Sequence, residues 1–367
     1  MLVHLILVAA LSGAICACLV QPLSALARRI GLVDRPDFRK FHSGDVPIIG
    51  GLAMYLSVLA TTVAVHPTWW SLSPLVVGSG LVLMGVLDDR FSLSYIFRLL
   101  LQIITALCMV YVGQIGIESI GNITGYGPVV IGGTFSIVFT VVCTVGVINS
   151  INMIDGVDGL AGVIISITLM PLAYFAWRVG DTKSVMLMAS FLAALAVFLY
   201  FNSRFFRPRA VIFMGDAGSM LFGLLLVWYF IRLTQGDNPP LSPVAAGWIF
   251  GLPLVDTISV LVGRILDKQS PLKPDRNHFH HRLMSVGLSA NHTVLLMGFF
   301  QCGFVVVGII CNEIPKLEPL LFWLFTIIVV MHHFFTPLVL ERIATDFKRR
   351  LAARKRKAAQ QEAITKA

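Results

Sequence analysis

Long apolar stretches alternate with short polar segments along most of the chain. Eleven stretches each hold roughly the 20 mostly apolar residues that a helix needs to cross a bilayer. They lie at residues 2–24, 48–66, 74–91, 97–116, 133–151, 159–179, 184–202, 218–234, 243–263, 291–312 and 319–340. The stretches are continuous, whereas a transmembrane β-strand alternates between apolar and polar residues. We therefore predict an all-α polytopic membrane protein, a bundle of about eleven transmembrane helices.

The basic residues are distributed unevenly between the connecting segments. All but four of the 28 lysines and arginines follow an odd-numbered stretch or lie in the C-terminal tail. The four exceptions are Arg178, Lys183, Arg232 and Lys316. Cytoplasmic loops of membrane proteins carry the excess of lysine and arginine. The pattern predicts a periplasmic N-terminus and a cytoplasmic C-terminus.

The predicted organisation is one transmembrane domain, residues 1–341, followed by a basic cytoplasmic tail, residues 342–367. Basic runs at 348–350 and 354–357 give the tail its charge. Next to a membrane, such runs typically contact anionic lipid headgroups. No aromatic platform accompanies them, so we expect the lipid bilayer as partner and no nucleic acid.

Composition excludes two broad classes of protein, soluble globular domains and disordered chains. The chain is 57% hydrophobic and 13% charged, with a net charge of +9. Soluble domains are roughly 25% charged, and disordered chains are poor in apolar residues. The six cysteines lie in apolar stretches without a Cys-x-x-Cys pair, which argues against a disulfide framework or a zinc site.

Acidic residues, amides and histidines form four clusters on the side that the basic residues predict to be cytoplasmic. The clusters are Asp88 with Asp89; Asn152, Asp155, Gly156 and Asp158; Phe213 with Asp216; and His278, His280 and His281. Carboxylates near a bilayer are costly and usually functional. Because two independent patterns agree on the side, we predict one composite site at the inner membrane face.

The residue types in these clusters indicate the chemistry. Several carboxylates with an amide oxygen are ligands for Mg²⁺, or for Mn²⁺, and are poorly suited to zinc. Nearby arginines and histidines would hold phosphate charge. The combination favours phosphoryl chemistry on a diphosphate substrate, in which catalysis is mainly positioning and charge stabilisation.

Each cluster alone has a simpler structural explanation. Asp-Asp can be a solvated helix end, Asp-Gly-x-Asp-Gly a turn, Gly-Asp-x-Gly-Ser a helix cap, and His-x-His-His an adventitious metal binder. The alternative from another class is a membrane transporter, in which charges lie near the midplane, often on broken helices. Only Asp256 lies deep within a stretch, and its partner is not visible in the sequence.

The four clusters, in this order, resemble those of the polyprenyl-phosphate N-acetylhexosamine-1-phosphate transferases. Residues 34–42 and 47–51 add to the resemblance. The Arg-Lys-x-His segment at 39–42 and the His-x-His-His form are most similar to the N-acetylglucosamine branch. Val46 and Ile154 depart from the branch that transfers phospho-N-acetylmuramoyl-pentapeptide, which stays as the alternative together with other N-acetylhexosamine branches.

The resemblance implies a reaction and its partners. Undecaprenyl phosphate would attack the β-phosphorus of UDP-N-acetylglucosamine and release UMP, as the first membrane step of O-antigen or enterobacterial common antigen synthesis. It also implies the bacterial inner membrane as location, Mg²⁺ (or Mn²⁺) as cofactor and a homodimer as one arrangement.

The resemblance further implies roles for individual residues. Asp216 and Asn152 would bind the metal. The catalytic residues would be Asp88, Asp89 and Asp155. The residues expected to contact substrate are Gly156, Asp158, Phe213, Arg98, Arg276, His278, His280 and His281.

Overall fold

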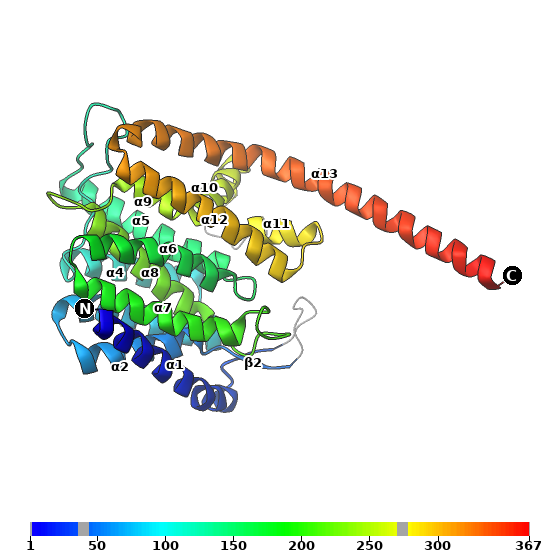
Figure 1. Cartoon of the computed structure of the whole chain (residues 1–367), viewed down its shortest axis with the longest axis horizontal. Coiled ribbons are helices and arrows are strands. Elements are labelled where there is room, and N and C mark those ends of the chain that lie inside the picture. The colour runs from blue at the N-terminus through cyan, green and yellow to red at the C-terminus, as the bar shows by residue number, and fades with distance from the viewer. Residues whose placement is uncertain (1, 36–43, 270–277, 367) are drawn as a thin grey trace.

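The computed structural model describes residues 2–35, 44–269 and 278–366. Most of its helices run side by side in a bundle with connecting loops at the two ends, and the C-terminal part of α13 extends beyond it (Figure 1). They are α1 (Leu2–Ile30), α2 (Gly50–Val65), α3 (Trp69–Phe91), α4 (Tyr95–Tyr111), α5 (Gly133–Ile154), α6 (Leu160–Arg178), α7 (Thr182–Asn202), α8 (Gly215–Thr234), α9 (Pro243–Ile249), α10 (Gly251–Leu266), α11 (Phe279–Ser285), α12 (Ala290–Glu313) and α13 (Glu318–Lys366).

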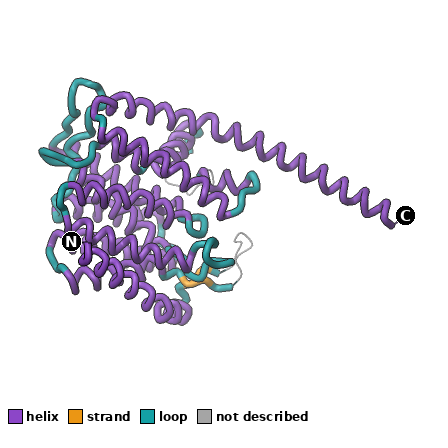
Figure 2. The backbone as a smooth tube through the Cα atoms, in the orientation of Figure 1, coloured by secondary structure: helices purple, strands orange, loops and turns teal. Residues whose placement is uncertain are grey.

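Two short strands are an exception to the predicted all-α fold. β1 (Val33–Asp34) and β2 (Val46–Pro47) pair antiparallel, and Figure 2 shows them at one end of the bundle. The chain after β2 then bonds to the segment before α8. Phe213 N donates to Pro47 O at 2.9 Å, and Gly50 N donates to Phe213 O at 2.8 Å. These bonds join the start of α2 to the start of α8.

Within the described ranges, eight helices are long and apolar enough to cross a membrane, and the bent pair α9–α10 makes a ninth candidate. The predicted stretches 48–66 and 97–116 correspond to α2 and α4, which have only 16 and 17 residues. At 1.5 Å per residue they reach about 24–26 Å, less than the roughly 30 Å of a hydrocarbon core. The number of eleven spans and the orientation therefore stay predictions.

The ninth predicted stretch, 243–263, corresponds to two helices, α9 and α10, with a sharp bend between them. α9 and α10 meet at an angle of 86°. Proline has no N–H, and in a helix interior its ring clashes with the carbonyl four residues earlier. Pro253 therefore cannot donate the hydrogen bond to Ile249 O that a continuous helix would contain. The buried Gln301 side chain pairs with backbone groups at the break, donating to Ile249 O at 2.7 Å and accepting from Leu252 N at 3.1 Å.

α8 is the centre of the bundle. All its residues from 217 to 231 are buried, and α2, α3, α5 and α6 pack around it. Glycines allow the closest approaches. A Cβ at Gly51 would overlap the backbone at Gly218, and a Cβ at Gly85 would overlap the backbone at Ala217. The first turn of α8 is thereby held directly against α2 and α3.

Candidate functional site

Arg98 joins two of the predicted acidic residues. Its Nη1 donates to Asp88 Oδ2 at 2.8 Å and to Asp216 Oδ2 at 3.1 Å. Asp88 is buried at the end of α3, and its other oxygen accepts from Leu93 N at 2.7 Å. One cationic nitrogen thus lies between carboxylates that are far apart in sequence.

Asn152 approaches Asp216 from α5. Its Nδ2 donates to Asp216 Oδ1 at 2.7 Å and to Ser219 Oγ at 2.9 Å. Both oxygens of Asp216 therefore have a partner, Asn152 on one and Arg98 on the other. Ser219 belongs to the Gly-Asp-x-Gly-Ser motif, but the sequence assigns it no part in the site.

Asp89 lies against the N-terminus of α8. Both of its carboxylate oxygens accept from Asp216 N, each at 3.1 Å. The first N–H groups of a helix have no partner within the helix, and Asp89 supplies an acceptor for one of them. Gly215 has a φ of +73°, and a Cβ at this position would overlap Asp89 Oδ2 and Ile48. Asp89 thus orients Asp216, the predicted metal ligand.

The donor set fits a magnesium ion better than an ion that needs several side-chain ligands. Among the described residues, no three His, Cys, Asp or Glu side chains converge on one position for a metal. Mg²⁺ usually takes one or two carboxylates and completes its shell with water and substrate phosphates. Asp88 and Asp216 lie close enough for one nitrogen of Arg98 to contact both, so a single cation can reach both carboxylates.

The turn after α5 carries the second cluster. Burial, followed by the negative charges of Asp216 and Asp89, raises the pKa of Asp155 well above its usual value. Asp158 instead accepts a hydrogen bond of 2.6 Å from Arg204 Nε. Asp155 therefore lies close enough to Asp216 and Asp89 to be repelled by their negative charges. Arg204 is a partner that the sequence does not reveal.

The histidine segment is anchored by the buried Asp256 of α10. Asp256 Oδ2 lies 2.9 Å from His278 Nδ1, and its Oδ1 accepts from Phe279 N at 2.9 Å. Asp256 and His278 are each 2% exposed. Asp256 thus holds the first residues of α11 and has the partner that the sequence does not show.

His280 faces the turn after α5. Its side chain is buried, and a Cβ at Gly156 would lie 2.8 Å from its Nε2. Within the described part of the chain, neither ring nitrogen has a hydrogen-bond partner. Burial, then the neighbouring His281, lowers the pKa of His280 to about 3. A neutral imidazole, whose two nitrogens have no partner among the described residues, therefore lies beside Gly156. The His281 ring centroid is 4.1 Å from that of His280.

Two predicted residues remain. Phe213 is half-buried and lies three residues before Asp216, in the segment bonded to Pro47 and Gly50. Arg276 lies outside the described residues. The structure thus brings Asp88, Asp89, Asn152, Arg98 and Asp216 into direct contact and sets His280 against Gly156.

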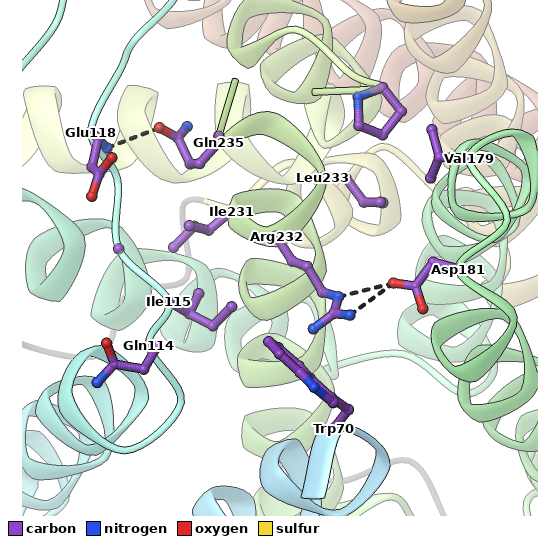
Figure 3. A pocket seen from close by; sticks show the side chains of 13 residues that line it. Trp70, Gln114, Ile115, Glu118, Val179, Asp181, Ile231, Arg232, Leu233 and Gln235 are labelled. Carbon is purple, nitrogen blue, oxygen red and sulfur yellow. Dashed lines mark hydrogen bonds and ion pairs between the residues drawn. The ribbon is translucent and has the colours of Figure 1, made fainter. Parts of the chain in front are cut away.

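A cavity of about 430 Å³ lies at the other end of α8 (Figure 3). There Arg232 donates to Asp181 Oδ2 from Nε at 3.0 Å and from Nη2 at 2.9 Å. The guanidinium carbon is 4.6 Å from the ring centroid of Trp70. None of the predicted site residues within the described ranges lines this cavity, so it is separate from the carboxylate site.

Comparison with known proteins identifies the family. A model of "Glycosyl transferase family 4" matches residues 71–234. The chain is similar to proteins named undecaprenyl-phosphate alpha-N-acetylglucosaminyl 1-phosphate transferase. The Escherichia coli relative is 31% identical over 288 residues, 78% of each chain. The Haemophilus influenzae relative is 34% identical over 291 residues, 78% of this chain and 81% of its own.

These matches cover the helices that carry the acidic clusters, and they come from enzymes, which decides against the transporter alternative. The chain is therefore a membrane enzyme that belongs to glycosyl transferase family 4.

Proposed function

We propose that this enzyme transfers N-acetylglucosamine 1-phosphate from UDP-N-acetylglucosamine to undecaprenyl phosphate. The products are undecaprenyl-diphospho-N-acetylglucosamine and UMP. The names of the relatives support undecaprenyl phosphate as the acceptor and N-acetylglucosamine 1-phosphate as the transferred group. The contacts among Asp88, Arg98, Asn152 and Asp216 gather charged groups at one site. Such a site supports the transfer of a charged phosphoryl group.

The proposed step exchanges one phosphoanhydride for another. An oxygen of the acceptor phosphate forms a bond to the β-phosphorus of the nucleotide sugar. The bond from that phosphorus to the bridging oxygen breaks, and UMP leaves with the electron pair. A phosphate monoester has a second pKa near 6, so at pH 7 it is mostly the dianion. The acceptor therefore needs no protein base, and we assign Asp88 the task of orienting it.

We assign the Mg²⁺ of this reaction to Asp216 and to the amide oxygen of Asn152, whose Nδ2 is the atom that donates to Asp216. When bound, the ion would neutralise diphosphate oxygens and the developing charge of the leaving UMP. Arg98 already contacts the same carboxylate and supplies fixed positive charge for the phosphates. Asp89 acts through the backbone of Asp216, so we treat it as a positioning residue.

The remaining residues are proposed to bind the donor. His280 is neutral and has two ring nitrogens available beside Gly156, so it can exchange hydrogen bonds with the sugar or diphosphate. Phe213, Asp158 and the segment containing Arg276, His278 and His281 complete the proposed donor site. We place this site on the inner face of a bacterial cytoplasmic membrane and the product in cell-surface polysaccharide synthesis.

The single observation that carries the proposal is the Arg98 nitrogen shared by Asp88 and Asp216. The test measures UMP release by the purified protein in vesicles that contain undecaprenyl phosphate, with Mg²⁺ and a panel of UDP-sugars. We expect turnover with UDP-N-acetylglucosamine and its loss in Asp216→Asn. Asp237→Asn, an exposed acid outside the site, is the control.

Two results would overturn the proposal. Failure to release UMP from any UDP-N-acetylhexosamine would reject the reaction. Normal turnover by Asp216→Asn would reject the metal assignment. A preference for another UDP-N-acetylhexosamine would keep the reaction class and change the donor.

A further inference from the structure

A second layer of polar contacts lies deeper in the bundle than the carboxylate site. Gln102 of α4 accepts a hydrogen bond of 2.7 Å from Asn149 Nδ2 of α5. The Nε2 of the same Gln102 side chain donates to the sulfur of Met220 in α8, at 3.6 Å. Gln102 thus joins α4 to the two helices that carry the proposed metal ligands.

Each residue of this layer lies three or four positions from a residue of the site on the same helix. The pairs are Gln102 with Arg98 on α4, Met220 with Asp216 on α8, and Asn149 with Asn152 on α5. Residues at this spacing share one face of a helix and lie one turn apart. Because α4 and α8 begin at the site and α5 ends there, all three steps lead in the same direction. The second layer therefore lies directly beneath the site.

α4 has few other polar connections to the bundle. Only four of its 17 residues are buried, namely Gln102, Thr105, Ala106 and Met109. The hydroxyl of Thr105 donates to Leu101 O within α4 itself. In the described part of the chain, Arg98 and Gln102 are the only residues of α4 whose side chains form hydrogen bonds with another helix. Besides apolar packing, Gln102 therefore determines where α4 lies relative to α5 and α8.

The contact between Gln102 and Asn149 resists displacement of α4. Gln102 is 3% exposed, and a buried amide is costly unless its polar groups are paired. A thioether sulfur is a weak acceptor, so the bond from Asn149 is the stronger of the two. Sliding or rotation of α4 would break that bond and, one turn away, move the guanidinium of Arg98 from its two carboxylates.

We propose that Gln102 is a positioning residue for the transfer step, which keeps the Arg98 nitrogen between Asp88 and Asp216. The proposal rests on the proposed function, in which Arg98 supplies positive charge to the phosphates. Gln102 is too deeply buried to touch a substrate, so it acts through Arg98 alone. Only interactions that are stronger in the transition state raise kcat. Exact placement of Arg98 matters most when charge develops on the leaving UMP, so Gln102 contributes to kcat more than to donor binding.

The first test is steady-state UMP release by Gln102→Met in the full-length protein. Methionine is also unbranched and similar in size, but it lacks the amide groups of Gln102. We expect kcat to fall about 10-fold with little change in KM for the donor, because a displacement of about 1 Å can lower a rate by up to 10²-fold. The matched control is Thr105→Val, which removes a buried hydroxyl that bonds only within α4 and should keep the wild-type kcat.

Two kinetic results would overturn the proposal. One is a wild-type kcat in Gln102→Met, and the other is an equal fall of kcat in Gln102→Met and Thr105→Val. Asn149→Ala removes the same hydrogen bond from the side of α5. It should reproduce the fall in kcat, and it replaces Gln102→Met as the test if the methionine variant does not fold.

A double-mutant cycle on stability tests the coupling without any turnover. The midpoint temperatures of thermal unfolding are compared for the wild type, Gln102→Met, Arg98→Gln and the double variant. If Gln102 holds Arg98 in place, each single change weakens the same arrangement, so the two shifts should not be additive. Additive shifts would overturn the proposal even in an active enzyme. Failure of the wild type to release UMP would instead reject the proposed function, and non-additive shifts would still support the coupling of Gln102 to Arg98.

Discussion

Asp256 and His278 are 22 positions apart, and their side chains meet at 2.9 Å in a buried contact between α10 and α11. The second oxygen of the same carboxylate accepts from the backbone of Phe279. One acidic side chain thus sets both the ring orientation of His278 and the starting position of α11. The placement of His280 two residues later depends on this contact.

Asp256→Asn should lower turnover more than it lowers stability. The asparagine side chain has the same volume and one acceptor oxygen, but it has no charge. Hydrogen bonds to charged groups contribute about 1.5–3 kcal/mol to stability, so the variant should hold His278 and Phe279 less firmly. We expect kcat/KM to fall by roughly 10-fold or more, with KM for the donor rising because His280 is misplaced. Steady-state kinetics with varied UDP-sugar measures this split. Asp256→Glu should recover part of the loss, and unchanged kinetics in Asp256→Asn would contradict the positioning role.

Arg98→Ala should nearly abolish activity, and Arg98→Lys should retain a measurable part of it. Asp88 and Asp216 both contact the Nη1 atom of Arg98, so the single ammonium nitrogen of lysine can take its place. Alanine leaves the two neighbouring carboxylates without a cation between them. Loss of one electrostatic group in an active site typically costs about 10²–10³-fold in rate. UMP release assays compare the three proteins. Wild-type activity of the alanine variant would show that the shared cation is not needed.

Gly85→Ala should destabilise the protein and disturb the site, while Gly80→Ala on the same helix should not. A Cβ at Gly85 would overlap the backbone of Ala217, next to Asp216, whereas a Cβ at Gly80 meets nothing within 4 Å. Forcing extra atoms into a packed interior costs about 1–3 kcal/mol, and glycine to alanine in an open helix position is neutral or slightly favourable. Thermal unfolding and UMP release are measured on both variants. A similar response of the two would contradict the close contact between α3 and α8.

Acidification should weaken the folded state through His280. Its pKa is lowered to about 3 in the folded protein, against about 6.5 in an unfolded chain. Between these values the unfolded state binds the extra proton, so stability falls as pH falls from about 6.5 towards 3. The midpoint temperature of His280→Gln should therefore depend less on pH over this window than that of the wild type. The activity profile of the wild type should show no ionisation of His280 near pH 6.5.

The outline of the fold follows from the sequence because lipid imposes it. Every predicted apolar stretch coincides with a helix or with the pair α9–α10, since backbone groups in a bilayer must bond within their own segment. The break at Phe250 is different. Pro253 signals an interruption, but the side chain that satisfies the broken backbone, Gln301, comes from α12. A partner that far along the chain leaves no mark on the local pattern.

For the site, as for the fold, the sequence predicts which residues come together but not the details of their contacts. Residue type and order along the chain predicted that the clusters containing Asp88, Asn152 and Asp216 form one composite site. The structure joins these three residues through Arg98 and hydrogen bonds. The orientation of each acid was not predictable. Asp89 faces a helix N-terminus and Asp158 faces Arg204, and both choices depend on the packing of helices distant in sequence.

The complete enclosure of α8 has a consequence for how the protein is assembled. α8 is the least apolar of the eight long candidate helices, and it is almost completely covered by the rest of the protein. Contacts with the other helices of the protein therefore contribute more than contacts with lipid acyl chains to keeping α8 in the membrane. During biosynthesis its insertion is expected to be cooperative with α3 and α5, which precede it, and a chain truncated directly after α8 should already hold it in place.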